Sequence, residues 1–292
     1  MKLSIAAKIQ GTIRALGVNV HRWPTDRHLA LEYPVSTRPR YGFKRPPHPQ
    51  IAQLLEAKRG EFERILADIG RRKPLLSGIP AGQPDEPLAP FWNNGWFPAL
   101  DAAALMHFLM ANRPRRYLEI GSGNSTIFAR HAISQGGLPT SLTSIDPEPR
   151  RGIDQLCDEI VRSPLEDVDL GVFERLAAGD ILFFDGSHRV FNDSDVTVFF
   201  LEVLPRVAPG VLVHIHDIFW PQDYPPEWGE RYYSEQYMLA MLLLYAPAKI
   251  DTVLANAFIS LDPDLGRRAA ELTDGEPLHE RFYGMSYWFR MA

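Results

Sequence analysis

The chain has 292 residues, of which 45% are hydrophobic and 23% are charged. This is the composition of an ordinary globular protein, and it excludes wholesale disorder, a collagen-like repeat and a disulfide scaffold. The one cysteine, Cys157, cannot form an intrachain bridge, and no apolar run approaches the roughly 18 residues of a spanning helix. We therefore expect a cytoplasmic protein.

The first 45 residues are basic, although the net charge of the chain is −5: nine lysines and arginines stand against Asp26 and Glu32. Such an arm can meet phosphate, a membrane surface or an acidic partner, or dock on its own acidic body or a second subunit of a homo-oligomer. Apolar residues at helical spacing predict a short amphipathic helix here. They are Ile5, Ile9, Ile13 and Leu16.

A proline-rich irregular segment separates this arm from a helix that we expect at about 51–69, with Gly70 at its C-terminal cap. Residues 74–92 are again rich in proline and glycine. We place a domain boundary near residue 90. The interpretation is a basic helical and irregular extension, 1–90, followed by the main domain, 91–292.

From about residue 98, short apolar runs alternate with helical patterns. This alternation predicts an α/β fold whose parallel sheet has helices on both faces. Ligands of such folds bind beyond the carboxyl ends of the strands. The expected helices are Ala99–Met110, Ser125–Ile133, Asp195–Arg206 and Glu235–Tyr245. The expected strands are Tyr117–Ile120, Ser141–Asp146, Glu159–Arg162, Ile181–Asp185, Val211–His216, Ile250–Leu254 and Met285–Arg290.

A glycine loop follows the first of these strands and opens a helix. Gly121 permits a tight turn, and Gly123 lets a ligand approach the backbone. Asn124 or Ser125 is expected to cap the helix. Asp146 ends the second strand, where a carboxylate can accept hydrogen bonds from both hydroxyls of a ribose. The order of strand, glycine loop, helix, strand and acid predicts a nucleotide site.

Two residues argue against a dinucleotide in this loop. The dinucleotide fingerprint requires a third glycine where Thr126 stands, and a pyrophosphate disfavours a carboxylate such as Glu119 just before the loop. An acid at this place suits a cofactor that carries positive charge. The sulfonium and ammonium groups of S-adenosylmethionine meet this requirement.

The segments EIGSGNST, SID, FFDGSH and VHIHDIFWPQDYP resemble those of class I S-adenosylmethionine-dependent methyltransferases, in particular bacterial small-molecule and sugar O-methyltransferases. The resemblance covers about residues 90–292. It implies a Rossmann-like, mostly parallel seven-stranded sheet whose last two strands are an antiparallel pair. The residues expected to bind the cofactor are Glu119, Gly121, Ser122, Gly123, Ser125, Asp146 and Asp185.

Four titratable residues follow the fourth and fifth expected strands. Because parallel strands end at one edge of a sheet, we expect them to meet where a methyl acceptor would lie. They are Asp185, His188, His216 and Asp217. Methyl transfer needs an aligned acceptor oxygen and removal of its proton, which histidine can perform near neutral pH. We expect His188, His216 and Asp217 to be catalytic.

Asp185 and Asp217 also resemble the acids that hold magnesium in catechol-type and macrolide-sugar O-methyltransferases. Those sites usually add a third oxygen ligand directly after the second acid, where this chain has Ile218. A histidine would then complete the shell, which favours a softer ion. A divalent metal at Asp185 and Asp217 is therefore an open expectation.

Two neighbouring features have competing interpretations. His214 lies inside a strand and is expected to be a core histidine. The aromatic segment after Asp217 is either a wall for the acceptor or a hydrophobic lid that packs on the N-terminal segment.

The leading hypothesis is an S-adenosylmethionine-dependent O-methyltransferase for a small hydroxylated acceptor, a saccharide or a secondary-metabolite phenol, with no nucleic acid partner. The alternatives are an iron-dependent hydroxylase with the same fold, in which His188, Asp185 and His216 hold the metal, and a non-catalytic methyltransferase-like protein anchored by its basic arm. A dehydrogenase is disfavoured by Thr126 and Glu119.

Overall fold

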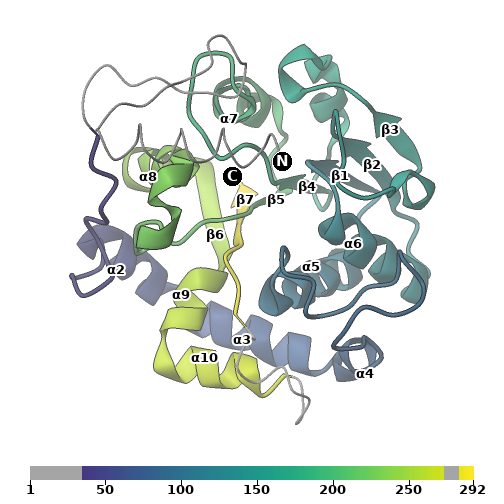
Figure 1. Cartoon of the computed structure of the whole chain (residues 1–292), viewed down its shortest axis with the longest axis horizontal. Coiled ribbons are helices and arrows are strands. Elements are labelled where there is room, and N and C mark those ends of the chain that lie inside the picture. The colour runs from purple at the N-terminus through teal and green to yellow at the C-terminus, as the bar shows by residue number, and fades with distance from the viewer. Residues whose placement is uncertain (1–34, 273–282) are drawn as a thin grey trace, which may run out of the picture. The chain divides into compact units, whose positions relative to one another are not determined.

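The computed structural model describes residues 35–272 and 283–292, and Thr37–Ala292 form one compact unit. A seven-stranded sheet crosses this unit in the order β3-β2-β1-β4-β5-β7-β6 (Figure 1). Strands β1 to β5 pair in parallel, whereas β7 is antiparallel to both β5 and β6. This confirms the expected Rossmann-like sheet and its antiparallel final pair. The strands are β1 Arg116–Ile120, β2 Ser141–Ile145, β3 Glu159–Val161, β4 Ile181–Phe184, β5 Leu212–Ile215, β6 Ile250–Ala255 and β7 Tyr287–Met291.

Helices cover both faces of the sheet, with α3, α5 and α6 on one side and α7 and α8 on the other (Figure 1). Burial on both faces explains why the strands are continuous apolar runs instead of alternating ones. The helices are α2 Pro49–Ala57, α3 Arg59–Gly70, α4 Lys73–Ser77, α5 Ala99–Asn112, α6 Asn124–Gln135, α7 Asp195–Val198, α8 Glu235–Tyr245, α9 Asn256–Leu261 and α10 Pro263–Ala270.

Three local expectations need correction. The helix expected at 51–69 is two helices, α2 and α3, which break at Lys58, two residues before the poor helix former Gly60. The helix expected at Asp195–Arg206 is helical throughout but irregular: α7 runs into a π-helical turn and then a 3-10 turn that contains Pro205. Helix α6 is capped at Gly123 and not at Asn124 or Ser125, because the Thr126 hydroxyl accepts the Gly123 N–H at 3.0 Å.

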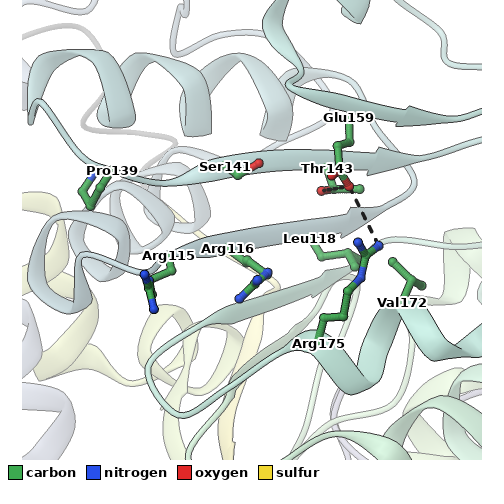
Figure 2. A pocket seen from close by; sticks show the side chains of 9 residues that line it. All are labelled: Arg115, Arg116, Leu118, Pro139, Ser141, Thr143, Glu159, Val172 and Arg175. Atoms are coloured by element: carbon green, nitrogen blue, oxygen red, sulfur yellow. Dashed lines mark hydrogen bonds and ion pairs between the residues drawn. The ribbon is translucent and has the colours of Figure 1, made fainter.

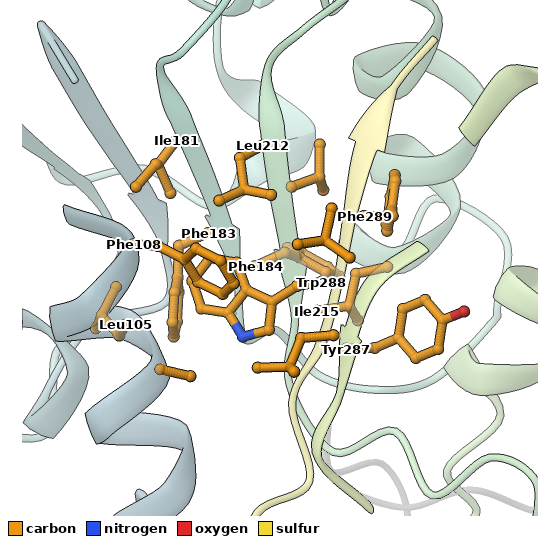
Figure 3. Packing of buried hydrophobic residues seen from close by; sticks show 14 of the residues in the cluster. Leu105, Phe108, Ile181, Phe183, Phe184, Leu212, Ile215, Tyr287, Trp288 and Phe289 are labelled. Carbon is orange, nitrogen blue, oxygen red and sulfur yellow. The ribbon is translucent and has the colours of Figure 1, made fainter. Parts of the chain in front are cut away.

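The core lies between α5 and the central strands. Every residue of β4 is buried, and the ring of Trp288 in β7 lies 4.7 Å from that of Phe108 in α5 (Figure 3). On β5, His214 stacks on Phe183 with ring centroids 3.8 Å apart, and its Nε2 lies 2.6 Å from the Ser286 hydroxyl. His214 is therefore the core histidine that was expected. This packing fixes the carboxyl ends of β4 and β5, where the candidate site begins.

Helices α2 and α3 pack within the same unit, α2 against α8 and α3 against β6 and α5. The domain boundary near residue 90 stays a prediction. The basic arm and its amphipathic helix fall on residues 1–34, outside the described residues. Within the described residues, no helix has the length and apolarity needed to cross a membrane.

Candidate active site

The turn after β1 depends on a glycine at position 121. Gly121 has φ 76°, and its N–H donates to the carbonyl oxygen of Ile145 at the end of β2. A Cβ at this position would collide with the backbone carbonyl oxygen of Asp185. The turn therefore brings the end of β1 directly against the segment that follows β4. In contrast, a Cβ at Gly123 would meet no atom within 4 Å, so space above that part of the loop is open.

Asp146 lies beside this turn, as expected. Its carboxylate accepts hydrogen bonds from the Ser122 N–H at 2.8 Å, the Ser122 hydroxyl at 2.9 Å and the Glu148 N–H at 2.9 Å. The structure thus brings together the loop residues and the acid that the sequence assigned to one nucleotide. A carboxylate held by backbone and hydroxyl donors keeps a defined orientation at the edge of the turn.

Glu119 is fully buried below the loop. Its two oxygens lie 3.2 Å from the Tyr117 hydroxyl and 2.6 Å from the Thr126 hydroxyl. Burial raises the pKa of its carboxyl to about 8, and these hydrogen bonds only partly offset the cost of desolvating the charge. Thr126 thus occupies the position of the missing third glycine and ties the acid to the start of α6.

A segment before α5 supports the same loop. The buried side chain of Asn94 accepts hydrogen bonds from the backbone of Phe97 and from the Asn124 amide at 3.0 Å, and Asn124 is the first residue of α6. Nearby, the Arg150 guanidinium lies 4.5 Å from the ring centroid of the exposed Trp96. The segment therefore braces both the helix start and the chain after Asp146.

The four titratable residues expected to converge do so, and we call them the inner cluster: Asp185, His188, His216 and Asp217. His188 Nε2 lies 3.3 Å from Asp185 Oδ1 and 3.4 Å from Asp217 Oδ2. His216 Nδ1 lies 3.6 Å from Asp185 Oδ1 and 3.4 Å from Asp217 Oδ1. The side chains thus form a closed ring in which carboxylates and imidazoles alternate.

The inner cluster opens on one side only. The side chain of Asp185 is 36% exposed, whereas those of His188, His216 and Asp217 are nearly buried. His188 and Asp217 also have left-handed backbone, with φ 61° and 54°. Non-glycine residues adopt this conformation rarely, and it concentrates at functional sites. A ligand would therefore reach the buried members past Asp185.

Charge pairing outweighs desolvation at three of the four groups of this cluster, and Asp217 is the exception. Burial works to lower the pKa of both histidines, but Asp185, Asp217 and the carboxylates behind them raise each pKa well above its ordinary value. The pKa of Asp185 falls well below its usual value, because His216 and His188 stabilise its charge by more than its partial desolvation costs. The pKa of Asp217 is raised by burial, and the two imidazoles offset this only in part.

Two further carboxylates, which sequence analysis missed, lie behind the histidines. Glu235 Oε2 at the start of α8 lies 2.7 Å from His188 Nδ1, and Asp101 Oδ2 in α5 lies 3.4 Å from His216 Nε2. Both are fully buried. The one sequence signal that could have found them is an acid in the first turn of an otherwise apolar helix.

The aromatic segment after β5 contacts two parts of the protein. Phe219, Tyr224, Trp228 and Tyr233 pack on one another, and the Tyr233 ring lies 4.5 Å from that of His188. Trp220 instead packs against His48 at 5.8 Å, and the His48 N–H donates to the Pro221 carbonyl. Both interpretations of this segment thus have a structural counterpart: one part borders the inner cluster, and another packs on an N-terminal segment.

A separate polar hollow of about 320 Å³ lies at the amino ends of β1 and β2 (Figure 2). Arg115, Arg116 and Arg175 line it together with Ser141 and Thr143. It contains none of the residues expected to bind the cofactor or to act in catalysis. The hollow therefore lies at the opposite end of the strands from the candidate active site.

Metal ligation gains no support from the structure. Among residues 35–272 and 283–292, no group of three or more His, Cys, Asp and Glu is arranged to hold a metal ion. In the inner cluster each carboxylate pairs with imidazole nitrogens at 3.3 to 3.6 Å. This pairing involves Asp185 and Asp217, the two expected ligands of a divalent metal. It also involves His188, Asp185 and His216, the set that an iron-dependent hydroxylase would need.

Comparison with known proteins finds a matching family model for part of the chain. Residues 118–218 match a family model described as a methyltransferase domain. An uncharacterised protein of Archaeoglobus fulgidus is 39% identical over 90 residues, which are 29% of this chain and 41% of that protein. The chain thus matches less than half the length of this relative.

Solved structures are more distant. The O-methyltransferase from Bacillus cereus in complex with S-adenosylhomocysteine is 15% identical, with 84% of this chain and 96% of that chain covered and a TM-score of 0.41. A methyltransferase from Podospora anserina bound to S-adenosylhomocysteine is 12% identical, with coverages of 86% and 100% and a TM-score of 0.41. The strand order is that of the class I S-adenosylmethionine-dependent methyltransferase fold, and residues 118–218 match the model of a methyltransferase domain.

Proposed function

We propose that the protein transfers the methyl group of S-adenosylmethionine to a hydroxyl oxygen of a small acceptor, a saccharide or a phenol. The observation that carries this proposal is the position of Asp185. Its backbone carbonyl lies against the glycine turn, while its side chain belongs to the inner cluster. A methyl donor held at the turn and an acceptor held by the cluster would therefore be neighbours.

The residues around the turn fit the donor. Open space above Gly123 admits a ligand to the backbone, and Asp146 offers a fixed carboxylate for ribose hydroxyls. Glu119 places a buried carboxyl group beneath the loop, and a cationic ligand bound above it would favour the ionised form of this carboxyl. When bound, the sulfonium supplies an electrophilic methyl group together with a good leaving group.

Asp217 is the proton acceptor in this proposal. Burial raises the pKa of its carboxyl, which makes it a stronger base than an exposed aspartate. The acceptor hydroxyl would give its proton to Asp217 as its oxygen forms the new bond to the methyl carbon and the carbon–sulfur bond breaks. Because both histidines have raised pKa values, they are cationic near neutral pH and stabilise the negative charge on the acceptor oxygen.

The aromatic residues beside His188 favour an acceptor with a flat face. Tyr233 lies against the His188 ring, and Trp228 packs against Tyr233 with ring centroids 5.6 Å apart. Such rings can cover the apolar face of a sugar or stack on an aryl ring. The polar edge of the same molecule would then face the inner cluster.

The test is a methylation assay with a panel of monosaccharides, glycosides and phenols. The protein is incubated with isotope-labelled S-adenosylmethionine, and products are separated and identified by mass spectrometry. We expect label in an O-methyl group of at least one hydroxylated acceptor, without added metal. Binding of the donor with no transfer to any hydroxyl, or transfer only to nitrogen or carbon, would contradict the proposal.

A further inference from the structure

Each histidine of the inner cluster has one ring nitrogen facing the cluster and the other facing a buried carboxylate. His188 directs Nε2 at Asp185 and Asp217, and its Nδ1 lies 2.7 Å from Glu235 Oε2. His216 directs Nδ1 inward, and its Nε2 lies 3.4 Å from Asp101 Oδ2. His188 therefore faces the cluster with Nε2 and the acid behind it with Nδ1, whereas His216 faces the cluster with Nδ1 and the acid behind it with Nε2.

Glu235 is costly to bury and is poorly satisfied. It is fully buried, and its Oε1 atom has no hydrogen-bond partner among the described residues. Burying such a group lowers stability unless its interactions compensate. In the part of the chain that the structure describes, its one side-chain hydrogen bond is with His188, across 47 positions of sequence. The carboxylate is therefore placed for that imidazole.

The start of α8 is already attached to the chain around His188 without this carboxylate. The N–H groups of Ser234 and Glu235 donate to the His188 carbonyl at 2.8 and 3.2 Å, and the Ser234 hydroxyl accepts the Val190 N–H at 2.9 Å. The backbone bonds fix where the residue lies. They leave the rotation of the imidazole ring free, and this is what the Glu235 side chain restricts.

Asp101 faces His216 at the longer distance of 3.4 Å, without the hydrogen bond that Glu235 makes to His188, and it also has a structural role. It accepts the N–H groups of Met285 and Ser286 before β7 and the amide of Asn256. Removing this side chain would disturb the edge of the sheet as well as the histidine. Glu235 is therefore the member of the pair that can be tested with the fold intact.

We propose that Glu235 and Asp101 are positioning residues, which hold the His188 and His216 rings with one nitrogen directed at the acceptor. The proposal rests on the proposed function for its catalytic consequence. For Glu235, the bond from Nδ1–H to the carboxylate sets which nitrogen faces inward. Without it, the ring would rotate away from the geometry that the reaction needs.

The test compares Glu235→Ala, Glu235→Gln and Glu235→Asp with Glu230→Ala, an exposed glutamate just before the same helix. We expect Glu235→Ala to lower kcat by about a hundredfold, the scale on which a displaced catalytic group acts. The dissociation constant of Glu235→Ala for S-adenosylmethionine should equal that of Glu230→Ala. Glu235→Gln should restore most of kcat, because its amide oxygen can still accept the Nδ1 proton.

The second readout is NMR of the imidazole protons, which needs neither acceptor nor donor. A downfield, slowly exchanging Nδ1 proton of His188 should be seen in the wild type and in Glu235→Gln and lost in Glu235→Ala. Should Glu235→Ala fail to fold, Glu235→Asp withdraws the carboxylate by one methylene, and its Nδ1 proton should exchange faster.

The outcomes separate the two proposals. If the wild type methylates an acceptor and Glu235→Ala is equally active, or if its Nδ1 proton is unchanged, the positioning role is wrong while the proposed function stands. If the proton is lost as expected but the wild type methylates no hydroxyl, the positioning role stands and the function is wrong.

Discussion

The two halves of the candidate site are built in different ways. The donor half, the glycine turn with Asp146, uses residues that are close in sequence: the Ser122 contacts with Asp146 span 24 positions. The acceptor half, the inner cluster, depends on buried acids from α5 and α8, on either side of the sheet. A local motif can specify a binding turn, whereas positioning a proton-transfer cluster requires the whole fold.

Asp185 connects the halves. Its carbonyl excludes any side chain at position 121, and its carboxylate contacts both histidines. If the halves are as distinct as we describe, substitutions in one should spare the other, and only changes at their junction should disturb both.

The largest effect is expected at the junction, from Gly121→Ala. The new methyl group would meet the Asp185 carbonyl and occupy left-handed backbone, so we expect the free energy of unfolding to fall by more than about 2 kcal/mol, with donor binding lost. Urea denaturation and calorimetry measure the two effects. Gly123→Ala is the matched control, since its methyl group meets nothing within 4 Å: it should fold normally and weaken donor binding only. Equal stability of both variants would contradict this account of the turn.

Asp217→Asn should affect the acceptor half alone. Removing the proton acceptor is expected to lower kcat by about 10² to 10⁴ and leave the donor dissociation constant unchanged. Asp193→Asn is a close control, because Asp193 is exposed and has the same φ of 54° as Asp217. If Asp217→Asn retains full activity, the proton goes to another group.

Glu119 should make stability depend on pH. Burial raises its folded-state pKa from 4.5 to about 8, so the folded chain keeps a proton that the unfolded chain has lost between these values. The free energy of unfolding should therefore fall as pH rises from about 5 to 8. Glu119→Gln removes this contribution and should give a flatter curve, with the variant relatively more stable above pH 8. The exposed Glu148→Gln should follow the wild type, and a Glu119→Gln curve parallel to the wild type would refute the assignment.

The smallest effect is expected for His214→Phe. His214 stacks on Phe183 in the core and contacts Ser286, and although its ring lies 5.9 Å from that of His216, it makes no ion pair with the carboxylates of the inner cluster. The variant should lose about 1 to 3 kcal/mol of stability, because the Ser286 hydroxyl is left without its partner, and should keep kcat. His216→Phe, two residues along, should lose activity. A loss of kcat in His214→Phe would show that His214 also belongs to the acceptor half.

These contrasts also show what could be predicted from sequence. The parallel sheet follows from the alternation of strands and helices, and the adjacency of Asp146 to the turn and the convergence of His188 with Asp217 follow from the rule that parallel strands end at one edge. The antiparallel final pair came from the family resemblance. Asp101 and Glu235 do not follow from these rules, because the packing of α5 and α8 decides which imidazole each acid meets. The break at Lys58 and the cap at Gly123 were missed because single residues, Gly60 in one case and Thr126 in the other, override the local pattern.

The most direct test of the central claim is calorimetric titration of the wild type and Asp146→Ala with S-adenosylmethionine. We predict one binding site per chain in the wild type, and affinity at least about tenfold weaker in Asp146→Ala, as expected for losing hydrogen bonds to a charged group. Asp264→Ala, an exposed aspartate on α10, should bind like the wild type. Absence of binding to the wild type, or equal affinity in Asp146→Ala, would contradict the claim that the donor lies on the glycine turn.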